Sequence, residues 1–382
     1  METTLSFKLF TATSELPKNW DSLTTANIFL SKSYLKILET AAPDNMSCHF
    51  IGLFREEKLV GIALSQFLDL SKVNSYGERD NCAKTSIRKF IFKNFSSKVL
   101  IIGNNMLTGQ NAYEFDSGLP YSDGLVLLKK AAIEIERKLR KKGTNTHITV
   151  FKDFKKEDLH YFRLREFDEF YQFSTQPNMV FTIRDNWKNE ADYINALNKK
   201  YRDQYKRARK KSEGLTKKKL SLEEIQKQEK TIYDLYYCVA KNAPFNTFYL
   251  PENHFSSFKM HLKDNFLFYG YFEGEKMIGF NTLIKNGGAV DTYFLGYDDN
   301  CQKEKMLYLN MLYDMICYSI NKGFRQIIFA RTALEIKSSV GAVPEKMYGF
   351  IKHHNSFINL FISRIFGYLE PELAWKERNP FK

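Results

Sequence analysis

The sequence lacks the patterns typical of disulfide-rich, zinc-binding, membrane-spanning and secreted proteins. Its five cysteines are spread over 382 residues without a Cys-x-x-Cys pair or a cysteine and histidine spacing typical of zinc. This argues against a disulfide framework, predicts no metal site and favours a reducing compartment. No apolar run reaches the roughly 18 residues of a membrane-spanning helix. The first 20 residues lack a basic start followed by an apolar run, so we expect no signal peptide and a cytoplasmic location.

The composition is that of a large, aromatic and basic globular protein. Hydrophobic residues make up 43% of the chain, with 33 phenylalanines and 22 tyrosines, so aromatic side chains must fill much of the core. A length of 382 residues suits two domains better than one. The formal net charge of +13 favours an anionic partner. The composition leaves open whether this is nucleic acid, an anionic membrane face, an acidic carrier protein or a phosphate-bearing cofactor.

The first half of the chain predicts a hairpin, a strand, a helix and another strand. Alternating apolar residues predict a hairpin of Cys48–Phe54 and Leu59–Phe67 across a polar turn. A buried strand follows at Val99–Asn105. Asp123–Lys142 has the amphipathic pattern of a helix and is followed by Gly143, as expected at a helix C-terminus. His147–Phe151 is the last predicted strand of this half.

The second half repeats that order. Asn265–Phe272 and Met277–Lys285 predict a hairpin across a Glu-Gly-Glu-Lys turn. Val290–Tyr297 alternates as a strand, and a helical pattern runs from about Glu304 to Lys322. Gln326–Ala330 is a short apolar strand. The matching order of elements predicts an internal duplication, although the two halves share no obvious sequence identity.

We therefore expect an α/β (α+β) fold with two similar domains, 1–180 and 181–382, each a mixed sheet flanked by helices. Between the repeats, Lys199–Lys219 carries eleven lysines and arginines and two acids, so most of the net charge is local. Helical patterns in and around this segment predict a basic helical pair at about 190–241.

The basic helical pair is a candidate binding surface. It could bind the backbone of a transfer RNA, an anionic membrane surface or an acidic carrier protein, or it could be a solvated helical pair without a partner. The cations expected to form this surface are Lys199, Lys200, Arg202, Lys206, Arg207, Arg209, Lys210 and Lys211.

Charged residues follow the last strand of the second repeat. Arg331, Glu335 and Lys337 come within about two helical turns after Gln326–Ala330. Open α/β sheets bind ligands at the carboxyl ends of their strands, so this cluster predicts a site. The alternative is a solvated first helical turn with an ion pair between Arg331 and Glu335, four residues apart.

Several segments carry a resemblance to a known family. They are Leu197–Ala208 (LNKKYRDQYKRA), Ala240–Phe245 (AKNAPF), Phe294–Asp298 (FLGYD) followed by Leu307–Tyr308, and Gly323–Phe324 leading to Phe329–Thr332 and Glu335–Lys337. Together with the repeated order of elements, they resemble the GNAT acyltransferase superfamily. The match is to its FemAB-like branch, which has tandem GNAT-like domains and includes peptidoglycan aminoacyltransferases and bacterial lipid N-acyltransferases. The similarity covers nearly the whole chain.

The resemblance implies an N-acyltransferase whose C-terminal domain carries the site. It would move an acyl group from acyl-CoA or an acyl carrier protein, used as co-substrate, to a primary amine. No tightly bound cofactor is expected. One alternative is a transfer-RNA-dependent aminoacyltransferase of peptidoglycan bridge synthesis. A second is a non-catalytic module on this fold that binds nucleic acid or a membrane surface.

One segment departs from the family pattern. Ordinary GNAT enzymes bind the CoA pyrophosphate with a glycine-rich turn whose backbone N–H groups face the phosphates. The corresponding stretch, Asp298–Lys305, contains no glycine, so close backbone approach is harder. Lys303 and Lys305 remain as phosphate contacts. This departure disfavours simple acetyl-CoA and leaves room for an acyl-CoA held differently, an acyl carrier protein or an aminoacyl-tRNA.

The resemblance also gives roles to the polar residues. Acyl transfer to an amine needs a proton acceptor and donors for the oxyanion rather than a triad, and the sequence has no Gly-x-Ser-x-Gly motif. Glu335 would orient the amine or accept its proton, and Arg331 or Lys337 would hold an anionic group of a substrate. Asp291 and Tyr293, on one strand face, would serve as base and acid, or would simply face solvent.

A histidine pair and an apolar tail complete the candidates. His353 is a candidate general base with Asn355 beside it for substrate binding, or else a capping histidine. Ser356–Leu369 is apolar and aromatic, which favours an acyl-chain tunnel, a bilayer contact or plain core. With the basic surface, it motivates an amino lipid as acceptor and peripheral contact with the inner face of an anionic membrane.

Overall fold

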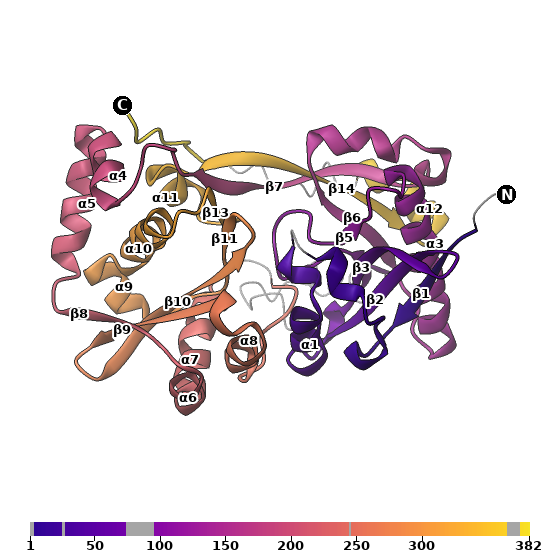
Figure 1. Ribbon diagram of the computed structural model, residues 1–382, viewed down its shortest axis with the longest axis horizontal. Helices are drawn as coiled ribbons and strands as arrows, with labels where there is room; N and C mark the ends of the chain where they lie inside the picture. The colour runs from indigo at the N-terminus through magenta and orange to yellow at the C-terminus, as the bar shows by residue number, and fades with distance from the viewer. Residues whose placement is uncertain (1–3, 25–26, 74–94, 244–245, 365–374) are drawn as a thin grey trace, which may run out of the picture. The chain divides into compact units, whose positions relative to one another are not determined.

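The computed structural model describes residues 4–24, 27–73, 95–243, 246–364 and 375–382. The chain divides into two compact units (Figure 1). The first unit comprises Met1–Thr175, Pro244–Leu250 and Lys346–Glu372, and the second comprises Gln176–Ala243, Pro251–Glu345 and Leu373–Lys382. The end of the Ala240–Phe245 motif and of the apolar run Ser356–Leu369 lie outside the described residues.

The sheet of the first unit has the strand order β1-β2-β3-β4-β6-β14, with β5 paired to β3. Neighbours are antiparallel except β4 and β6, which are parallel. The strands are β1 Leu5–Phe10, β2 Met46–Arg55, β3 Lys58–Asp69, β4 Lys98–Ile102, β5 Tyr113–Phe115, β6 Ile148–Phe154 and β14 Val343–His353. The helices are α1 Lys32–Thr40, α3 Tyr121–Lys141 and α12 Ser356–Leu360, with short 3-10 turns at Thr13–Glu15, Trp20–Leu23, Ile28–Leu30, Leu70–Lys72, Lys156–Phe162 and Arg165–Phe167.

Local sequence accounts for the helices of this unit. The Ser31 hydroxyl accepts a hydrogen bond from the Tyr34 backbone N–H and begins α1. Helix α3 buries residues at helical spacing, such as Leu128 and Ile135, and burial of each such side chain contributes about 1.5–3 kcal/mol. Gly143 has a φ of 82° just past the end of α3, a conformation that glycine adopts without strain.

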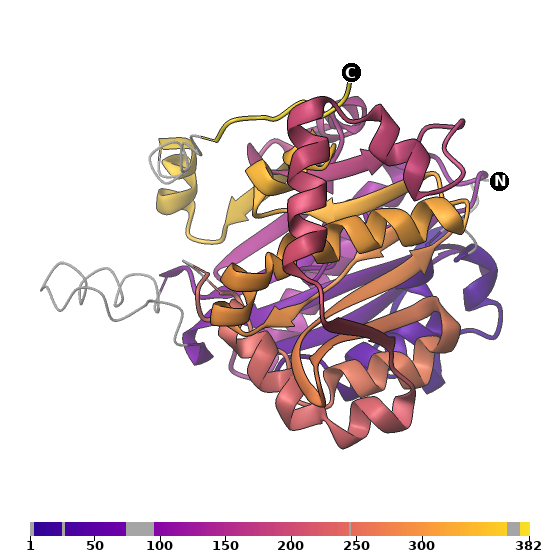
Figure 2. The same cartoon turned by 90° about the vertical axis from the view of Figure 1, so that its left-hand side faces the viewer.

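The sheet of the second unit has the order β8-β9-β10-β11-β13-β7, with β12 paired to β10. Here β11 and β13 are the parallel pair. The strands are β7 Tyr171–Thr182, β8 Leu215–Lys219, β9 Phe266–Glu273, β10 Lys276–Asn286, β11 Ala289–Thr292, β12 Gly296–Tyr297 and β13 Gln326–Ala330. The helices are α4 Glu190–Ala196, α5 Lys199–Lys211, α6 Leu222–Lys227, α7 Glu229–Ala240, α8 His254–Leu262, α9 Asp299–Lys305, α10 Leu307–Asn321 and α11 Leu334–Ser339, with a 3-10 turn at Lys263–Asn265. Helix α10 lies between the sheet and α5 (Figure 2).

The two sheets share one strand order, which confirms the predicted repeat. In each, a hairpin is followed by a strand, a helix and a parallel strand. The sixth strand is exchanged between the repeats. Strand β7 follows β6 along the chain but pairs with β13, and β14 follows β13 but pairs with β6. Each sheet therefore takes its last strand from the sequence that follows the other repeat.

Three predicted elements of the second half differ from the structure. The basic segment is helical only as far as Lys211, because Gly214 turns with a φ of 85° and Leu215–Lys219 then pairs with β9 as strand β8. The strand predicted at Val290–Tyr297 is interrupted between β11 and β12. The predicted turn before α10 is itself helix α9, and Met306, with a φ of 49°, separates the two helices.

Among the described residues, no helix combines the length and the apolarity that crossing a membrane requires.

The contact between α7 and β12 yields a stability prediction. A Cβ at Gly296 would lie 2.5 Å from backbone atoms of Leu235 and Tyr236, so Gly296→Ala should force α7 away from the sheet and lower the free energy of unfolding by about 1–3 kcal/mol. Urea unfolding measures this. The matched control is Gly288→Ala, whose Cβ would meet nothing closer than 3.7 Å. Equal stability of the two variants would contradict the close packing.

Candidate functional site

The two parallel strands of the second unit separate at their carboxyl ends. They pair from Ala289 and Gln326 to Asp291 and Ile328. Beyond this point the chain after β11 continues along β10, where it pairs again as β12, whereas Ala330 of β13 pairs with β7. Diverging strand ends of this kind are where open α/β sheets bind ligands. The structure thus places the predicted cluster after β13 at such an end.

The turn after β13 holds three non-glycine residues in left-handed conformations. Ala330, Thr332 and Ala333 have φ values of 58°, 72° and 47°. A β-branched residue such as threonine rarely adopts a positive φ, and each such residue costs on the order of 1–3 kcal/mol. Backbone strain of this kind persists only where the surroundings enforce it, and it concentrates at functional sites.

Lys337 helps to hold the turn in this conformation. Its side chain reaches back from α11, and Nζ donates to the backbone oxygen of Arg331 at 2.7 Å and to that of Ala330 at 3.4 Å. Lys337 is buried, and this burial lowers its pKa to about 7. Burial also lowers the pKa of Arg331, to about 10. Lys337 therefore binds the backbone of the turn, and its predicted contact with a substrate anion stays a prediction.

Asp291 is the last residue of β11 that pairs with β13, Tyr293 lies two residues beyond it, and both are buried. Burial raises the pKa of Asp291 to about 7, partly offset by a hydrogen bond from Asn286. The Tyr293 hydroxyl lies 3.0 Å from Nε2 of His254 in α8, and its ring stacks on Phe258 at 4.7 Å. Sequence reasoning missed His254, because a single histidine among aromatic residues carries no motif.

The outer side of α11 borders a pocket of about 450 Å³. It is lined by Lys200, Tyr201 and Gln204 of α5, by Glu335, Ile336 and Ser339 of α11, and by Arg378. The pocket brings together Glu335 and Lys200 from two separately predicted groups. Glu335 forms an ion pair with Arg378, whose Nε lies 3.0 Å from the carboxylate. The partner of Glu335 is thus Arg378, not Arg331 as the helical alternative supposed.

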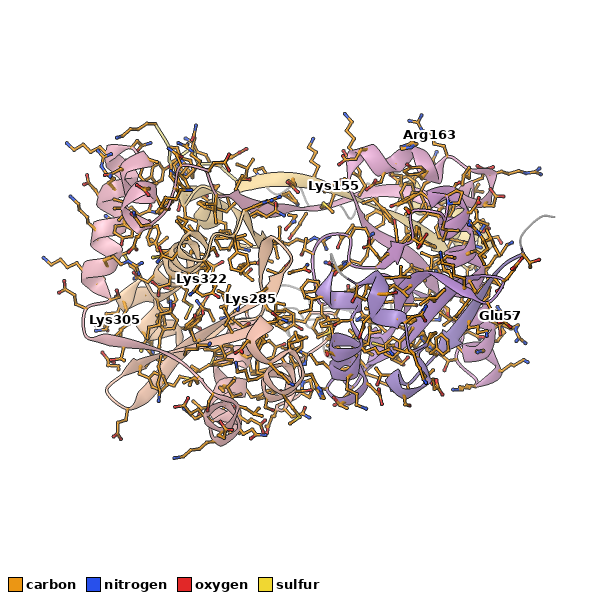
Figure 3. All side chains as sticks on the ribbon, viewed as in Figure 1. Glu57, Lys155, Arg163, Lys285, Lys305 and Lys322 are labelled. Atoms are coloured by element: carbon orange, nitrogen blue, oxygen red, sulfur yellow. The ribbon has the colours of Figure 1, made fainter. Side chains whose placement is uncertain are left out.

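The glycine-free segment forms a capped helix. The Asp298 carboxylate accepts hydrogen bonds from the backbone N–H groups of Asn300 at 2.9 Å and Cys301 at 3.1 Å, and these bonds hold its pKa below the usual range. The amides that would face a pyrophosphate are therefore already bound to a carboxylate. Lys305, labelled in Figure 3, pairs with Glu273 at 3.2 Å, and Lys303 is exposed.

His353 and Asn355 belong to the first unit. His353 is buried at the end of β14, where Nε2 lies 2.6 Å from the Phe95 carbonyl oxygen and Nδ1 accepts the Asn355 N–H at 3.0 Å. The Asn355 side chain accepts the Ile358 N–H and caps α12. These bonds give both residues a structural role, which corresponds to the capping alternative, and their predicted chemistry remains untested.

Two of the predicted surface cations, Arg209 and Arg202, have partners within the unit. Arg209 pairs with Glu190 of α4 at 2.9 Å and with Asp314 of α10 at 2.7 Å. Asp314 also accepts the Tyr271 hydroxyl at 2.8 Å. Arg202 donates to the Leu197 backbone oxygen. The other predicted cations, Lys199, Lys200, Lys206, Arg207, Lys210 and Lys211, are exposed.

In the first unit, the side chain of Lys152 bridges the carboxyl ends of the parallel strands β4 and β6. Lys152 of β6 donates to the backbone oxygens of Asn104 at 2.9 Å and Leu107 at 3.0 Å, in the segment that follows β4. It also pairs with Asp153, which is buried with a φ of 67°. Lys152 thus ties β6 to the segment after its parallel neighbour, whereas Lys337 binds only the turn of its own strand. Across the described residues, no group of three or more potential metal ligands is gathered.

Solved structures share this fold. No protein-family model matches the sequence, and no curated protein matches it. A crystal structure of FemX aligns with a TM-score of 0.56 and 11% identity over 93% of this chain and 99% of its own. A tandem GNAT protein from the clavulanic acid biosynthesis pathway aligns with a TM-score of 0.51 and 10% identity over 92% of this chain and 98% of its own. The chain therefore has a tandem GNAT-like fold, as its sequence predicted.

The lowered pKa of Lys337 predicts a pH dependence of stability. Its pKa falls from 10.5 to about 7 on folding, so the unfolded chain binds more protons between these values. The free energy of unfolding should therefore rise with pH in that window, by up to about 1.4 kcal/mol per pH unit. Urea unfolding from pH 7 to 9.5 measures the slope. Lys337→Met should flatten it and the exposed-lysine variant Lys303→Met should not; equal slopes in all three proteins would contradict the assignment.

The ion pairs of Arg209 predict that two substitutions in α5 differ in their effect on stability. Arg209→Met removes the cation of Glu190 and leaves the partly buried Asp314 with Lys217 alone, 3.4 Å away. We expect a loss of about 1–3 kcal/mol in the free energy of unfolding. Arg207→Met, two residues away on the same helix and exposed, should change it by less than about 0.5 kcal/mol. Thermal or urea unfolding tests both. A similar effect of the two substitutions would show that Arg209 is only a surface charge.

Proposed function

We propose that the chain transfers an acyl group from an activated donor to a primary amine at the carboxyl ends of β11 and β13. The observation that carries the proposal is the separation of these two parallel strands beside a strained turn, within a tandem GNAT-like fold. We place the proposed active site in the second unit because, in the first unit, Lys152 bridges the corresponding strand ends with hydrogen bonds.

The proposed reaction is a direct displacement. The amine lone pair attacks the carbonyl carbon of a thioester, the C–N bond forms, the C–S bond breaks, and the thiolate leaves with the bonding electron pair. Asp291 takes the proton that the amine loses, since a base with a pKa of about 7 suits transfer near neutral pH. Tyr293, held by His254, gives a proton to the leaving sulfur and regains one from solvent. Because a thioester is already activated, positioning supplies much of the rate.

The donor in this proposal is a long-chain acyl-CoA or an acyl carrier protein. The Asp298 cap removes the amides on which a pyrophosphate clamp would rely, so the donor is held through other groups. Phe357 and Leu360 of α12 are 72% and 74% exposed, which favours an amphipathic amine, such as an amino lipid, as acceptor. Peripheral contact with an anionic membrane face belongs to the same proposal.

A second candidate is transfer from an aminoacyl-tRNA. The exposed lysines and arginines of α5 and β8 favour it, because such a row matches a phosphate backbone. In that case the bond that breaks is the ester bond to the terminal ribose, and RNase treatment abolishes transfer. An acyl-CoA or carrier-protein donor leaves transfer insensitive to RNase.

A donor panel tests the proposed function. Purified protein is incubated with acyl-CoA of two to sixteen carbons, acyl carrier protein or aminoacyl-tRNA, each with amine acceptors, and amide products are measured by mass spectrometry. Asp291→Asn should lower kcat by about 10²–10⁴ at neutral pH while the protein stays folded, and the exposed-carboxylate control Asp264→Asn should not. Absence of amide product with every donor would reject the function. Full activity of Asp291→Asn would reject the role of Asp291.

A further inference from the structure

An asparagine beside the strained turn carries an oxygen without a partner. Asn178 of β7 is only 4% exposed, and its Oδ1 is buried with no hydrogen-bond donor among the residues that the structure describes. A buried acceptor left unsatisfied costs about 1–3 kcal/mol. Most buried polar atoms in folded proteins have a partner, so an exception calls for an explanation.

The strand register places Asn178 on the same face of the sheet as Asp291. Val180 of β7 pairs with Ile328 of β13, and Ile328 pairs with Asp291 of β11. Side chains of directly paired residues share a face, and alternate residues along a strand return to it. Asn178, two residues before Val180, therefore lies on that face. Its neighbour Met179 pairs with Ala330, which puts Asn178 next to the strained turn.

The other face of these strands is mainly apolar over the residues that the structure describes. Met179, Phe181, Val290 and Ile327 point into the apolar core cluster of the unit. The buried amine of Lys337, which contacts the same turn, donates to the backbone oxygens of Ala330 and Arg331. Asp291 and Asn178 thus lie on one face near the diverging strand ends, and Asn178 Oδ1 lacks a donor among the described residues.

We propose that Asn178 Oδ1 accepts a hydrogen bond from the acceptor amine at the carboxyl ends of β11 and β13. The inference rests on the proposed function and deepens it. An acceptor oxygen needs a donor, and an ammonium or amine nitrogen supplies N–H groups. A thioester carbonyl, a phosphate or a carboxylate supplies only acceptors at neutral pH. Asn178 would therefore position the amine substrate through its side-chain oxygen.

Asn178→Leu separates this role from a structural one. The two side chains are similar in volume, so removal of the unsatisfied oxygen should leave the free energy of unfolding unchanged or higher. The KM for the amine should rise at least tenfold, whereas the KM for the acyl donor should not change. Asn178→Asp keeps an acceptor oxygen and should retain most of the affinity for the amine.

Asn281→Leu is the matched control. Asn281 of β10 is 1% exposed and also has an Oδ1 without a partner among the described residues. It lies on the opposite face, because Leu283, two residues away, pairs with Thr292 while Ile284 pairs with Asp291. Its substitution should leave the KM for the amine as in the unsubstituted protein.

Ligand binding, measured as a shift in melting temperature, tests the inference without enzyme turnover. We expect n-octylamine to raise the melting temperature of the unsubstituted protein and of Asn281→Leu, and to shift Asn178→Leu much less. Sodium octanoate, which has only acceptors, should affect all three alike. If Asn178→Leu is destabilised with an unchanged KM and an unchanged octylamine shift, Asn178 is structural and the inference is wrong. If octylamine binds through Asn178 but no donor yields an amide, the proposed function fails and the amine site stands.

Discussion

One buried amine sets the geometry at the end of β13. Lys337 reaches back from α11 to the backbone oxygens of Ala330 and Arg331 and so holds a turn in which three non-glycine residues are left-handed. Without that contact the strain would relax, and the direction in which α11 leaves the sheet would change with it. Lys337 thus links the strained turn after β13 to the helix that borders the pocket.

The surroundings of α11 are built to resist that relaxation. The last residues of the chain pack along it, where the Arg378 backbone N–H donates to the Ser338 hydroxyl at 3.1 Å. Phe381 packs against Trp187, with ring centroids 5.5 Å apart, and a Cβ at Gly341 would lie 2.4 Å from its ring. On the other side, Arg209 joins α4, α5 and α10 through two carboxylates. These contacts form a rigid frame, and a rigid frame is what a positioning mechanism requires.

The parts of this structure set by local sequence were predictable. Strand β13 runs from Gln326 to Ala330 as the apolar pattern indicated, and the serine cap of α1 is in place. Contacts between residues far apart in the sequence could not be predicted, because they produce no pattern in the local sequence. Nothing in the pattern pairs Arg209 with Asp314, and a single asparagine before the apolar residues of β7 reads as an ordinary strand residue. The interruption at Met306 escaped prediction because tertiary packing, not helix propensity, decides it. The resemblance pointed to Arg331–Lys337. The missing hydrogen-bond partner of the Asn178 side-chain oxygen can be seen only in the three-dimensional structure.

The exchange of β7 and β14 has a consequence for biosynthesis. The outer edge of β6 is covered by β14, whose pairing residues Tyr348–His353 come about 200 residues after β6 in the chain. At translation rates of about 5–20 residues per second, the ribosome needs on the order of ten seconds or more to supply them. During that time the first repeat has all its other strands and an uncovered edge, which is the kind of surface that mispairs with other chains. The nascent chain therefore carries this open edge from the completion of β6 until β14 is made, which is after the proposed active site at β11 and β13 has been translated.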